Sequence, residues 1–213
     1  MNNPFEKVID AETEETFSDH LVIDEFRGKN EFLSNFFMRP FQTDIEFIDE
    51  NGEHQWITET FQSVEHAFQA SKVFDRDVQK VIRDAATPRK TKKLGRKARL
   101  RPDWEEVKVD IMERIVSDKF AQHKDLQLRL LFTGNAELIE GNTWNDDFWG
   151  VINGKGGKNH LGKILMRVRD LLTESLGDFE TVFKGFLSDN HLGFLIGHFN
   201  WEQNNEQETS SGC

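Results

Sequence analysis

Between residues 63 and 172 the apolar residues recur at intervals of three and four, in one segment after another. This spacing gathers apolar side chains on one face of an α-helix, so most of the chain is predicted to be helical. Pro88 and Pro102 divide the series, because proline disfavours helix in the preceding residue and suits the first turn of a new one. Helices are expected over about 63–74, from 77 to before 88, from 88, from 102 through 120, around 126–131, and after 159. Val81 is expected on an inner face of the second helix, and Leu171 on that of the last.

Extended structure is predicted mainly before residue 60. Residues 21–26 alternate loosely and suit a first strand, and residues 42–58 read as a hairpin with Asn51-Gly52 at its turn. Leu138-Ile139 suits a further short strand. The fold class expected is therefore α+β, mainly α-helical, with a small sheet or hairpin.

Changes in composition divide the chain into four parts. Residues 1–20 are acidic and lack periodicity, and are expected to form a flexible arm. A single domain is expected over 21–172. Residues 173–201 carry a further apolar series and are interpreted as a C-terminal extension packed on that domain. Residues 202–213 are polar and are expected to be a disordered tail.

Several classes of protein are excluded by what the sequence lacks. It has no run of eighteen apolar residues and no apolar segment at its N-terminus, so neither a membrane span nor a secretory signal is expected. The single cysteine, Cys213, excludes a disulfide scaffold. The seven histidines show no metal-ligand spacing, and no serine nucleophile motif occurs. We expect a cytoplasmic protein with no metal, no other cofactor and no membrane partner.

Charge is distributed unevenly. The net charge of −11 disfavours nonspecific binding to nucleic acid, yet residues 89–101 hold eight basic residues and no acid. These bases can form a solvated helix face, or one or two of them can bind a phosphorylated ligand. Arg96 and Arg101 suit either role.

The segment 63–72, SVEHAFQASK, carries the most chemical information. Glu65, Gln69 and Lys72 share one helix face, with about 10 Å of helical rise between the first and the last. Such a face could hold a sugar between a carboxylate and an amine. The alternative is an ordinary exposed face of polar residues.

Two further segments have a chemical and a structural interpretation. In Asn145–Gly150 an acid beside large aromatic residues can form a pocket that raises a carboxyl pKa, or Asp146 or Asp147 can cap a turn while Trp149 fills the core. The glycine-rich run 150–159 leads into a helix and can cradle a phosphate, or can be a flexible loop. It matches neither a Walker A loop nor a dinucleotide-binding fingerprint.

Taken in order, these segments resemble the NADAR (YbiA-like) family. The resemblance covers about residues 26–172 and leaves both tails unmatched. It rests on Phe32–Phe36, Ser63–Lys72, Thr87-Pro88, Leu94–Arg96, Arg101–Trp104, Lys119-Phe120, Asp147–Gly150 and Lys158–Met166.

The resemblance implies an N-glycosidase fold and hydrolysis of a bond between a ribose anomeric carbon and a nitrogen. Matched by position, Glu65 and Lys72 fall on the active-site helix of the family, Trp104 and Trp149 on its aromatic walls, and Asp146 or Asp147 on its second acid. Further substrate contacts are expected from Arg27, Ser34, Asn35 and Gln69, and phosphate contacts from Lys158, Asn159 and the N–H groups near Gly162. Leu33 and Phe36 are expected in the core.

The chemistry that the resemblance implies suits these residue types. Cleavage of a C1′–N bond builds positive charge on the ribose, which a carboxylate stabilises. We expect Lys72 to attack C1′ and form a Schiff base, with Glu65 handling protons. Attack by a water that Glu65 activates is the competing mechanism.

Two substrates are implied, a phosphorylated ribosylaminopyrimidine of riboflavin synthesis and an ADP-ribose conjugate such as ADP-ribosylated guanine, so nucleic acid is expected only as a modified-base substrate. Two other functions stay open. One is a non-catalytic module that binds ADP-ribose or NAD, and the other is an interaction protein that acts through residues 173–201.

Overall fold

A computed structural model describes residues 21–152 and 155–176. The predictions for residues 1–20, and for the part of the C-terminal extension and tail beyond 176, lie outside the described residues. The helices are η1 (Gly28–Leu33, a 3-10 helix), α1 (Val64–Ala70), α2 (Arg76–Arg83), α3 (Pro88–Gly95), α4 (Trp104–Ala121), α5 (Lys124–Leu131) and α6 (His160–Leu176). The strands are β1 (Val22–Ile23), β2 (Phe41–Ile48), β3 (His54–Phe61), β4 (Glu137–Leu138), β5 (Gly141–Asn142) and β6 (Val151–Ile152).

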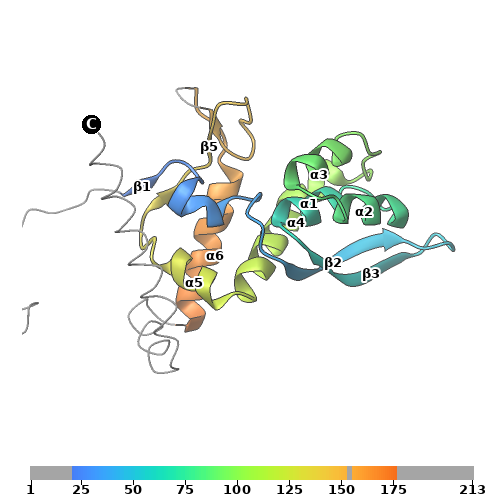
Figure 1. The fold of residues 1–213 in the computed structure, drawn as a ribbon, viewed down its shortest axis with the longest axis horizontal. Helices are drawn as coiled ribbons and strands as arrows, with labels where there is room; N and C mark the ends of the chain where they lie inside the picture. Colours follow the sequence, from blue (N-terminus) through green and yellow to red (C-terminus); the bar gives the residue numbers. More distant parts are fainter. Residues whose placement is uncertain (1–20, 153–154, 177–213) are drawn as a thin grey trace, which may run out of the picture.

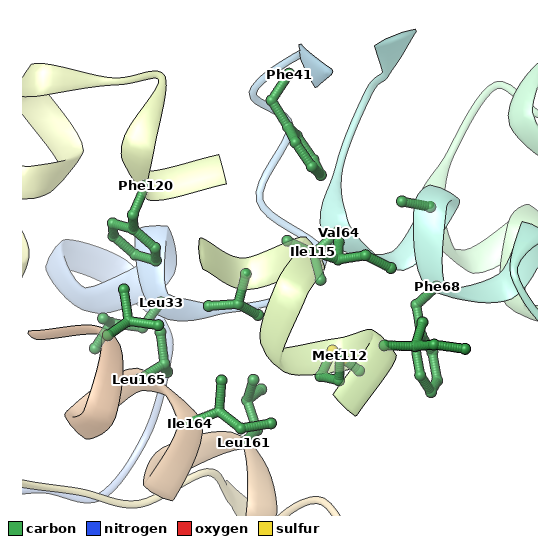
Figure 2. Packing of buried hydrophobic residues seen from close by; sticks show 14 of the residues in the cluster. Leu33, Phe41, Val64, Phe68, Met112, Ile115, Phe120, Leu161, Ile164 and Leu165 are labelled. Carbon is green, nitrogen blue, oxygen red and sulfur yellow. The ribbon is translucent and has the colours of Figure 1, made fainter. Parts of the chain in front are cut away.

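Helix α4 is the centre of the fold. It contacts α1 and β2 on one side and α5 and α6 on the other (Figure 1). Figure 2 shows how its inner residues Met112 and Ile115 lie between Phe68 of α1 and Leu161 of α6. Burial of these side chains away from water is the main source of stability in such a core. The α+β, mainly helical class is thus confirmed.

The described strands form three separate pairs. β2 and β3 make an antiparallel hairpin in which Phe41 pairs with Phe61 and Ile48 with His54, and Gly52 occupies the turn with a φ of +84°. The other pairs, β1 with β4 and β5 with β6, are short and parallel. The predicted hairpin is confirmed, whereas β5 and β6 were not predicted.

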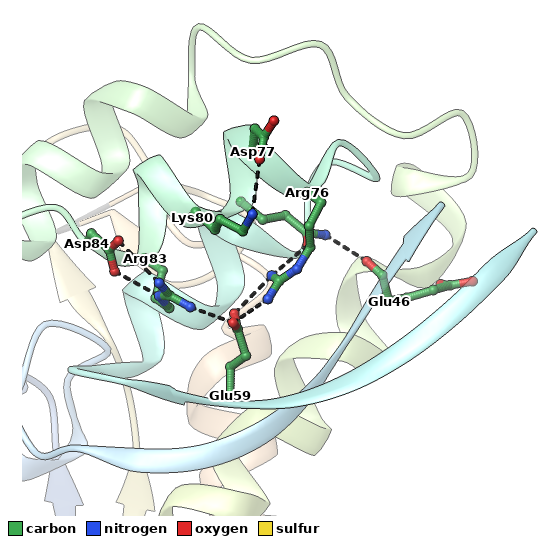
Figure 3. A network of polar contacts seen from close by, with 8 residues as sticks. Glu46, Glu59, Arg76, Asp77, Lys80, Arg83 and Asp84 are labelled. Carbon is green, nitrogen blue, oxygen red and sulfur yellow. Dashed lines mark hydrogen bonds and ion pairs between the residues drawn. The ribbon is translucent and has the colours of Figure 1, made fainter. Parts of the chain in front are cut away.

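An ionic cluster fastens the hairpin to the helices that follow it (Figure 3). Glu59 of β3 accepts hydrogen bonds from the guanidinium groups of Arg76 and Arg83 on α2. Arg101 is also structural, because it donates to Glu46 of β2 over 2.8 Å and to Asp103. Of the two roles left open for Arg101, the structure therefore supports that of a structural partner.

The start of α3 follows its sequence signals. Pro88 is its first residue, and the Thr87 hydroxyl accepts a hydrogen bond from the N–H of Lys90. The helix predicted to open at Pro102 begins instead at Trp104, after a turn.

Other details differ from the predictions. α1 ends at Ala70 rather than near residue 74, because the chain tightens into a turn in which the N–H of Lys72 reaches the carbonyl of Gln69. Val81 and Leu171, expected on inner faces, are 59% and 56% exposed. Helix α6 continues through the predicted boundary at 172 to Leu176.

Candidate active site

A cleft of about 850 Å³ opens beside α1 and is bounded by the residues on either side of η1, by α3, α4 and the segment 140–149. This volume is in the range of sites that bind nucleotide-sized ligands. The predicted site residues that line it are Arg27, Ser34, Asn35, Glu65, Gln69, Lys72, Asp146, Asp147 and Trp149. The structure therefore brings together residues that are up to 122 positions apart in the sequence, from Arg27 to Trp149.

Glu65 lies in the first turn of α1 and is only 4% exposed. Its backbone N–H donates to the carbonyl of Asn35 over 2.9 Å, which fixes the start of α1 against the loop after η1. The amide of Gln69 donates to Oε1 of Glu65 over 2.9 Å. The alternative interpretation, an ordinary exposed polar face, is wrong, because every residue of α1 is buried and its polar residues Glu65 and Gln69 line the cleft.

Lys72 follows α1 by two residues, and its ammonium lies over two aromatic rings. Nζ is 5.4 Å from the ring centroid of Phe68 and 5.5 Å from that of Trp104. Trp149 packs edge-on against Phe68 at 5.2 Å. The aromatic rings hold the amine at the cleft while limiting its contact with water.

Burial shifts the pKa values of Glu65 and Lys72 in opposite directions. It raises the pKa of the Glu65 carboxyl above its ordinary value, although Lys92, Lys72 and Arg96 oppose this. It lowers the pKa of the Lys72 ammonium, which Glu65 opposes and Lys92 reinforces. Both shifts favour an uncharged carboxylic acid and an uncharged amine. A neutral amine next to a proton carrier is the arrangement that nucleophilic catalysis by lysine needs.

One wall of the cleft is basic. Arg89, Lys92 and Arg96 occupy one side of α3 and its C-cap, and all three line the cleft. Within the described ranges none of them forms an ion pair with a carboxylate, and Lys92 Nζ lies 5.7 Å from the Phe36 ring centroid. These three cations are free to bind an anionic ligand, which supports the second interpretation of the basic segment.

The segment 140–149 supplies a further part of the cleft lining. Asp146 is half-buried, and its Oδ1 accepts a hydrogen bond from the N–H of Trp149 over 2.9 Å. Asp147 is exposed. Asp146 therefore caps a turn and also lines the cleft.

Four predicted site residues are not among those that line the cleft. Trp104 is buried beneath Lys72. Lys158 lies with Nζ 5.2 Å from the Phe148 ring centroid. The Asn159 side chain bonds to the backbone of Glu140 and Leu138. Gly162 packs against the carbonyl of Leu138, where a Cβ would lie 2.0 Å from the oxygen.

Sequence reasoning also missed residues that do line the cleft. Glu140 and Trp144 were not considered, and Phe36, expected in the core, is 39% exposed and forms part of the cleft. Neither Glu140 nor Trp144 falls on a periodic segment. Glu140 could have been found from its position in the sequence, because it is an acidic residue directly after the predicted short strand Leu138-Ile139.

In the described part of the chain, no three metal-ligating side chains come together as a candidate metal site, and no helix is long and apolar enough to cross a membrane.

Several known proteins are similar to this chain in sequence or in structure. The NADAR domain model matches residues 23–173. N-glycosidase YbiA of Shigella flexneri is 37% identical over 142 residues, which are 66% of this chain and 80% of that protein. Riboflavin biosynthesis protein PYRR, chloroplastic, of Zea mays is 34% identical over 137 residues, which are 59% of this chain and 21% of that protein. The NMR structure of the Escherichia coli protein YbiA superposes with a TM-score of 0.58 at 30% identity, covering 74% of this chain and 91% of that one.

The fold, the buried acid–amine pair and these relatives define an enzyme of the N-glycosidase class, a hydrolase of N-glycosyl bonds. The chain belongs to the NADAR family.

Proposed function

We propose that the cleft hydrolyses the C1′–N bond of a phosphorylated ribosyl compound, with Lys72 as nucleophile and Glu65 as proton carrier. The observation that carries this proposal is the placement of Glu65 and Lys72 in one cleft beneath the cationic wall of α3. The compound is either a ribosylaminopyrimidine phosphate or an ADP-ribose conjugate such as ADP-ribosylated guanine. Relatives named as riboflavin biosynthesis proteins support the first substrate.

The pair first exchanges a proton. Glu65 takes the proton of the Lys72 ammonium, because burial favours the neutral form of each group. The free amine attacks C1′ as the C1′–N bond breaks, and the electrons of that bond go to the leaving nitrogen. The leaving nitrogen gains one proton, and the new ammonium between C1′ and Lys72 gives one up. Glu65 then gives its proton to the ring oxygen when the sugar opens, which leaves a protonated Schiff base between C1′ and Lys72. Water hydrolyses the Schiff base and returns the amine.

The walls place the rest of the substrate. Arg89, Lys92 and Arg96 bind the phosphate, since cations without an acidic partner lose little on contact with an anion. Asp146 lies across the cleft from α3 and accepts hydrogen bonds from ribose hydroxyls through the carboxylate oxygen that Trp149 does not engage. A ribose phosphate therefore spans the cleft with C1′ over the acid–amine pair.

A release assay on two substrates tests this proposal. Ribosylaminopyrimidine phosphate and an ADP-ribosylated guanine oligonucleotide are incubated separately, and the products are read by mass spectrometry. We expect one of them to be cleaved, and Glu65→Ala and Lys72→Ala to abolish release. Glu31→Ala and Lys97→Ala are matched controls, because these exposed residues do not line the cleft, and they keep full activity.

If the wild type cleaves neither substrate, the proposal is wrong. Binding of ADP-ribose or NAD to the intact chain would then identify it as a binding module.

A further inference from the structure

Glu140 lines the same cleft as Glu65 and Lys72, at the junction of β4 and β5. It is half-buried, and its carboxyl group forms no hydrogen bond and no ion pair with the described residues. Every other acid in the cleft has a structural partner or lies exposed: Glu65 accepts from Gln69, Asp146 accepts from Trp149, and Asp147 is exposed. A half-buried carboxyl group without a partner in a catalytic cleft needs an explanation, because burial of a charge is costly.

The backbone of Glu140 is held on two sides. Its N–H donates to Oδ1 of Asn159 over 3.1 Å, and its carbonyl accepts from the N–H of Val151 over 2.9 Å. The amide of Asn159 also donates to the carbonyl of Leu138 over 2.8 Å. Asn159, the residue before α6, adopts a φ of +51°. Its side chain lies between the carbonyl of Leu138 and the N–H of Glu140.

Two glycines allow this close packing. A Cβ on Gly150 would lie 2.1 Å from the Glu140 carbonyl, and one on Gly162 would lie 2.0 Å from the Leu138 carbonyl and 2.6 Å from Asn159 Oδ1. Neither position tolerates a side chain, because the atoms that it would meet include backbone. The Asn159–Gly162 segment was expected from sequence to bind phosphate. It instead packs against the backbone next to Glu140 and holds it in place.

Burial and the neighbouring acids bring the pKa of Glu140 close to neutrality. Burial, and next the Asp146 carboxylate, raise the pKa of Glu140 to about 7, while Lys92 lowers it and Glu65 raises it. The other charged groups that line the cleft are Arg27 before η1, Lys72 after α1, Arg89 and Arg96 of the α3 wall, and Asp147. An acid that is half protonated at neutral pH is matched to donate a proton at the pH where the enzyme works.

We propose that Glu140 is the general acid that protonates the leaving nitrogen of the substrate, held in place by Asn159. This inference rests on the proposed function and deepens it, since it assigns the proton that C1′–N cleavage requires. It also gives a role to a second carboxyl group that lines the cleft besides that of Glu65.

Cleavage of the C1′–N bond involves one new bond to C1′ and two proton transfers. The lone pair of the Lys72 amine forms the new bond to C1′, and the electrons of the C1′–N bond go to the leaving nitrogen. That nitrogen takes the proton of Glu140 and leaves as a neutral base. The Glu140 carboxylate then accepts one proton from the positively charged nitrogen that joins Lys72 to C1′, and is restored before the ring opens.

Substitution of Glu140 tests the assignment, with whichever of the two substrates the wild type cleaves. Glu140→Gln keeps the shape and removes the acid, so kcat should fall by about 100-fold or more, which is the range of general acid catalysis. The wild-type kcat/KM should decline above about pH 7, and Glu140→Gln should lose that decline. Glu137→Gln is the matched control, because Glu137 is exposed on β4 and does not line the cleft.

A rescue experiment separates a proton donor from a structural role. In Glu140→Ala, added imidazole should restore part of the rate near pH 7, because it titrates near neutrality as the histidine side chain does, so its conjugate acid can donate the missing proton. Asn159→Ala should also lower kcat, but imidazole should not restore it, since there the acid is present and misplaced. Thermal melting should show Glu140→Gln to be as stable as the wild type.

The inference is overturned if Glu140→Gln keeps a rate within about twofold of the wild type. It is also overturned if the rate falls while the decline above pH 7 persists and imidazole restores nothing. If the wild type itself releases no base from either substrate, the proposed function has failed, a result that the Glu140 variants cannot mimic.

Discussion

Glu65 and Lys72 face one cleft from the two ends of a single short helix, and burial moves their pKa values toward each other. The helix is seven residues long, so the turn after Ala70 is what brings the lysine back beside the cleft. No ion pair joins the two groups. A small reactant can therefore enter between a proton carrier and an amine that are already positioned.

Gly95 should be required for the position of Glu65. A Cβ at residue 95 would lie 2.0 Å from Oε1 and 3.0 Å from Cβ of Gln69, whose amide donates to Glu65. Gly95→Ala should therefore displace Gln69 and lower kcat at least tenfold while the protein remains folded. The double variant Gly95→Ala/Gln69→Ala removes the clash with Oε1 and leaves only the 3.0 Å contact with Cβ, so its activity should be close to that of Gln69→Ala alone. Steady-state kinetics with thermal melting checks this, and an additive double variant would contradict it.

Replacing Arg89 should change only the KM, whereas replacing Lys92 should change both the KM and the pH dependence of the reaction. Arg89→Met should raise KM for the phosphorylated substrate about tenfold and leave the pH profile unchanged. Lys92→Met should raise KM similarly and also shift the profile, because Lys92 holds down the pKa of Glu65 and that of Glu140.

The exposed variant Lys97→Met serves as the control for both, since Lys97 does not line the cleft. Kinetics on the phosphorylated substrate and its dephosphorylated counterpart gives the measurement. Equal losses on both substrates would show that the α3 wall does not bind phosphate.

Lys119 should make stability depend on pH. It is 1% exposed, its Nζ donates to the carbonyl of Phe32 over 2.7 Å, and burial lowers its pKa to about 7. From pH 7 to about 10.5 the unfolded chain binds more protons at this side chain than the folded one, so the free energy of unfolding rises with pH over that range. The gain is complete above pH 10.5 and is lost as the pH falls to 7.

Lys119→Met should remove this rise, and Lys163→Met, at an exposed position of α6, should keep it. Urea unfolding between pH 7 and 9 measures the slope for each protein. Parallel slopes for Lys119→Met and the wild type would refute the role assigned to the buried lysine.

Local signals in the sequence predict much of the fold. Asn51-Gly52 between alternating residues predicts the β2–β3 hairpin, and Pro88 with Thr87 predicts the start of α3. What they cannot predict is pairing over long distances. β1 joins β4 through Val22 and Glu137, two strands of two residues each, whose partners are fixed only when the helices have packed.

The site was predictable where its residues lie on a patterned helix. The spacing of Glu65 and Gln69 predicts a shared helix face, and Lys72 reaches the same cleft from the turn after α1. The spacing does not predict that this face is buried, because burial depends on α3 and the segment 140–149 packing over it. Glu140 was missed because it lies between two-residue strands without periodicity. Asn159 and Gly162 were assigned to phosphate because a glycine-rich segment before a helix suits an anion, whereas here both pack on neighbouring backbone.

Trapping of the covalent intermediate tests the central role of Lys72 most directly. The protein is incubated with a substrate that it cleaves, treated with borohydride, digested and analysed by mass spectrometry. We predict a reduced sugar adduct on Lys72 that is absent from Lys72→Met, which should also be inactive. An active wild type with no adduct at Lys72, together with an active Lys72→Met and an inactive Glu65→Gln, would contradict the account and show that water activated by Glu65 attacks C1′.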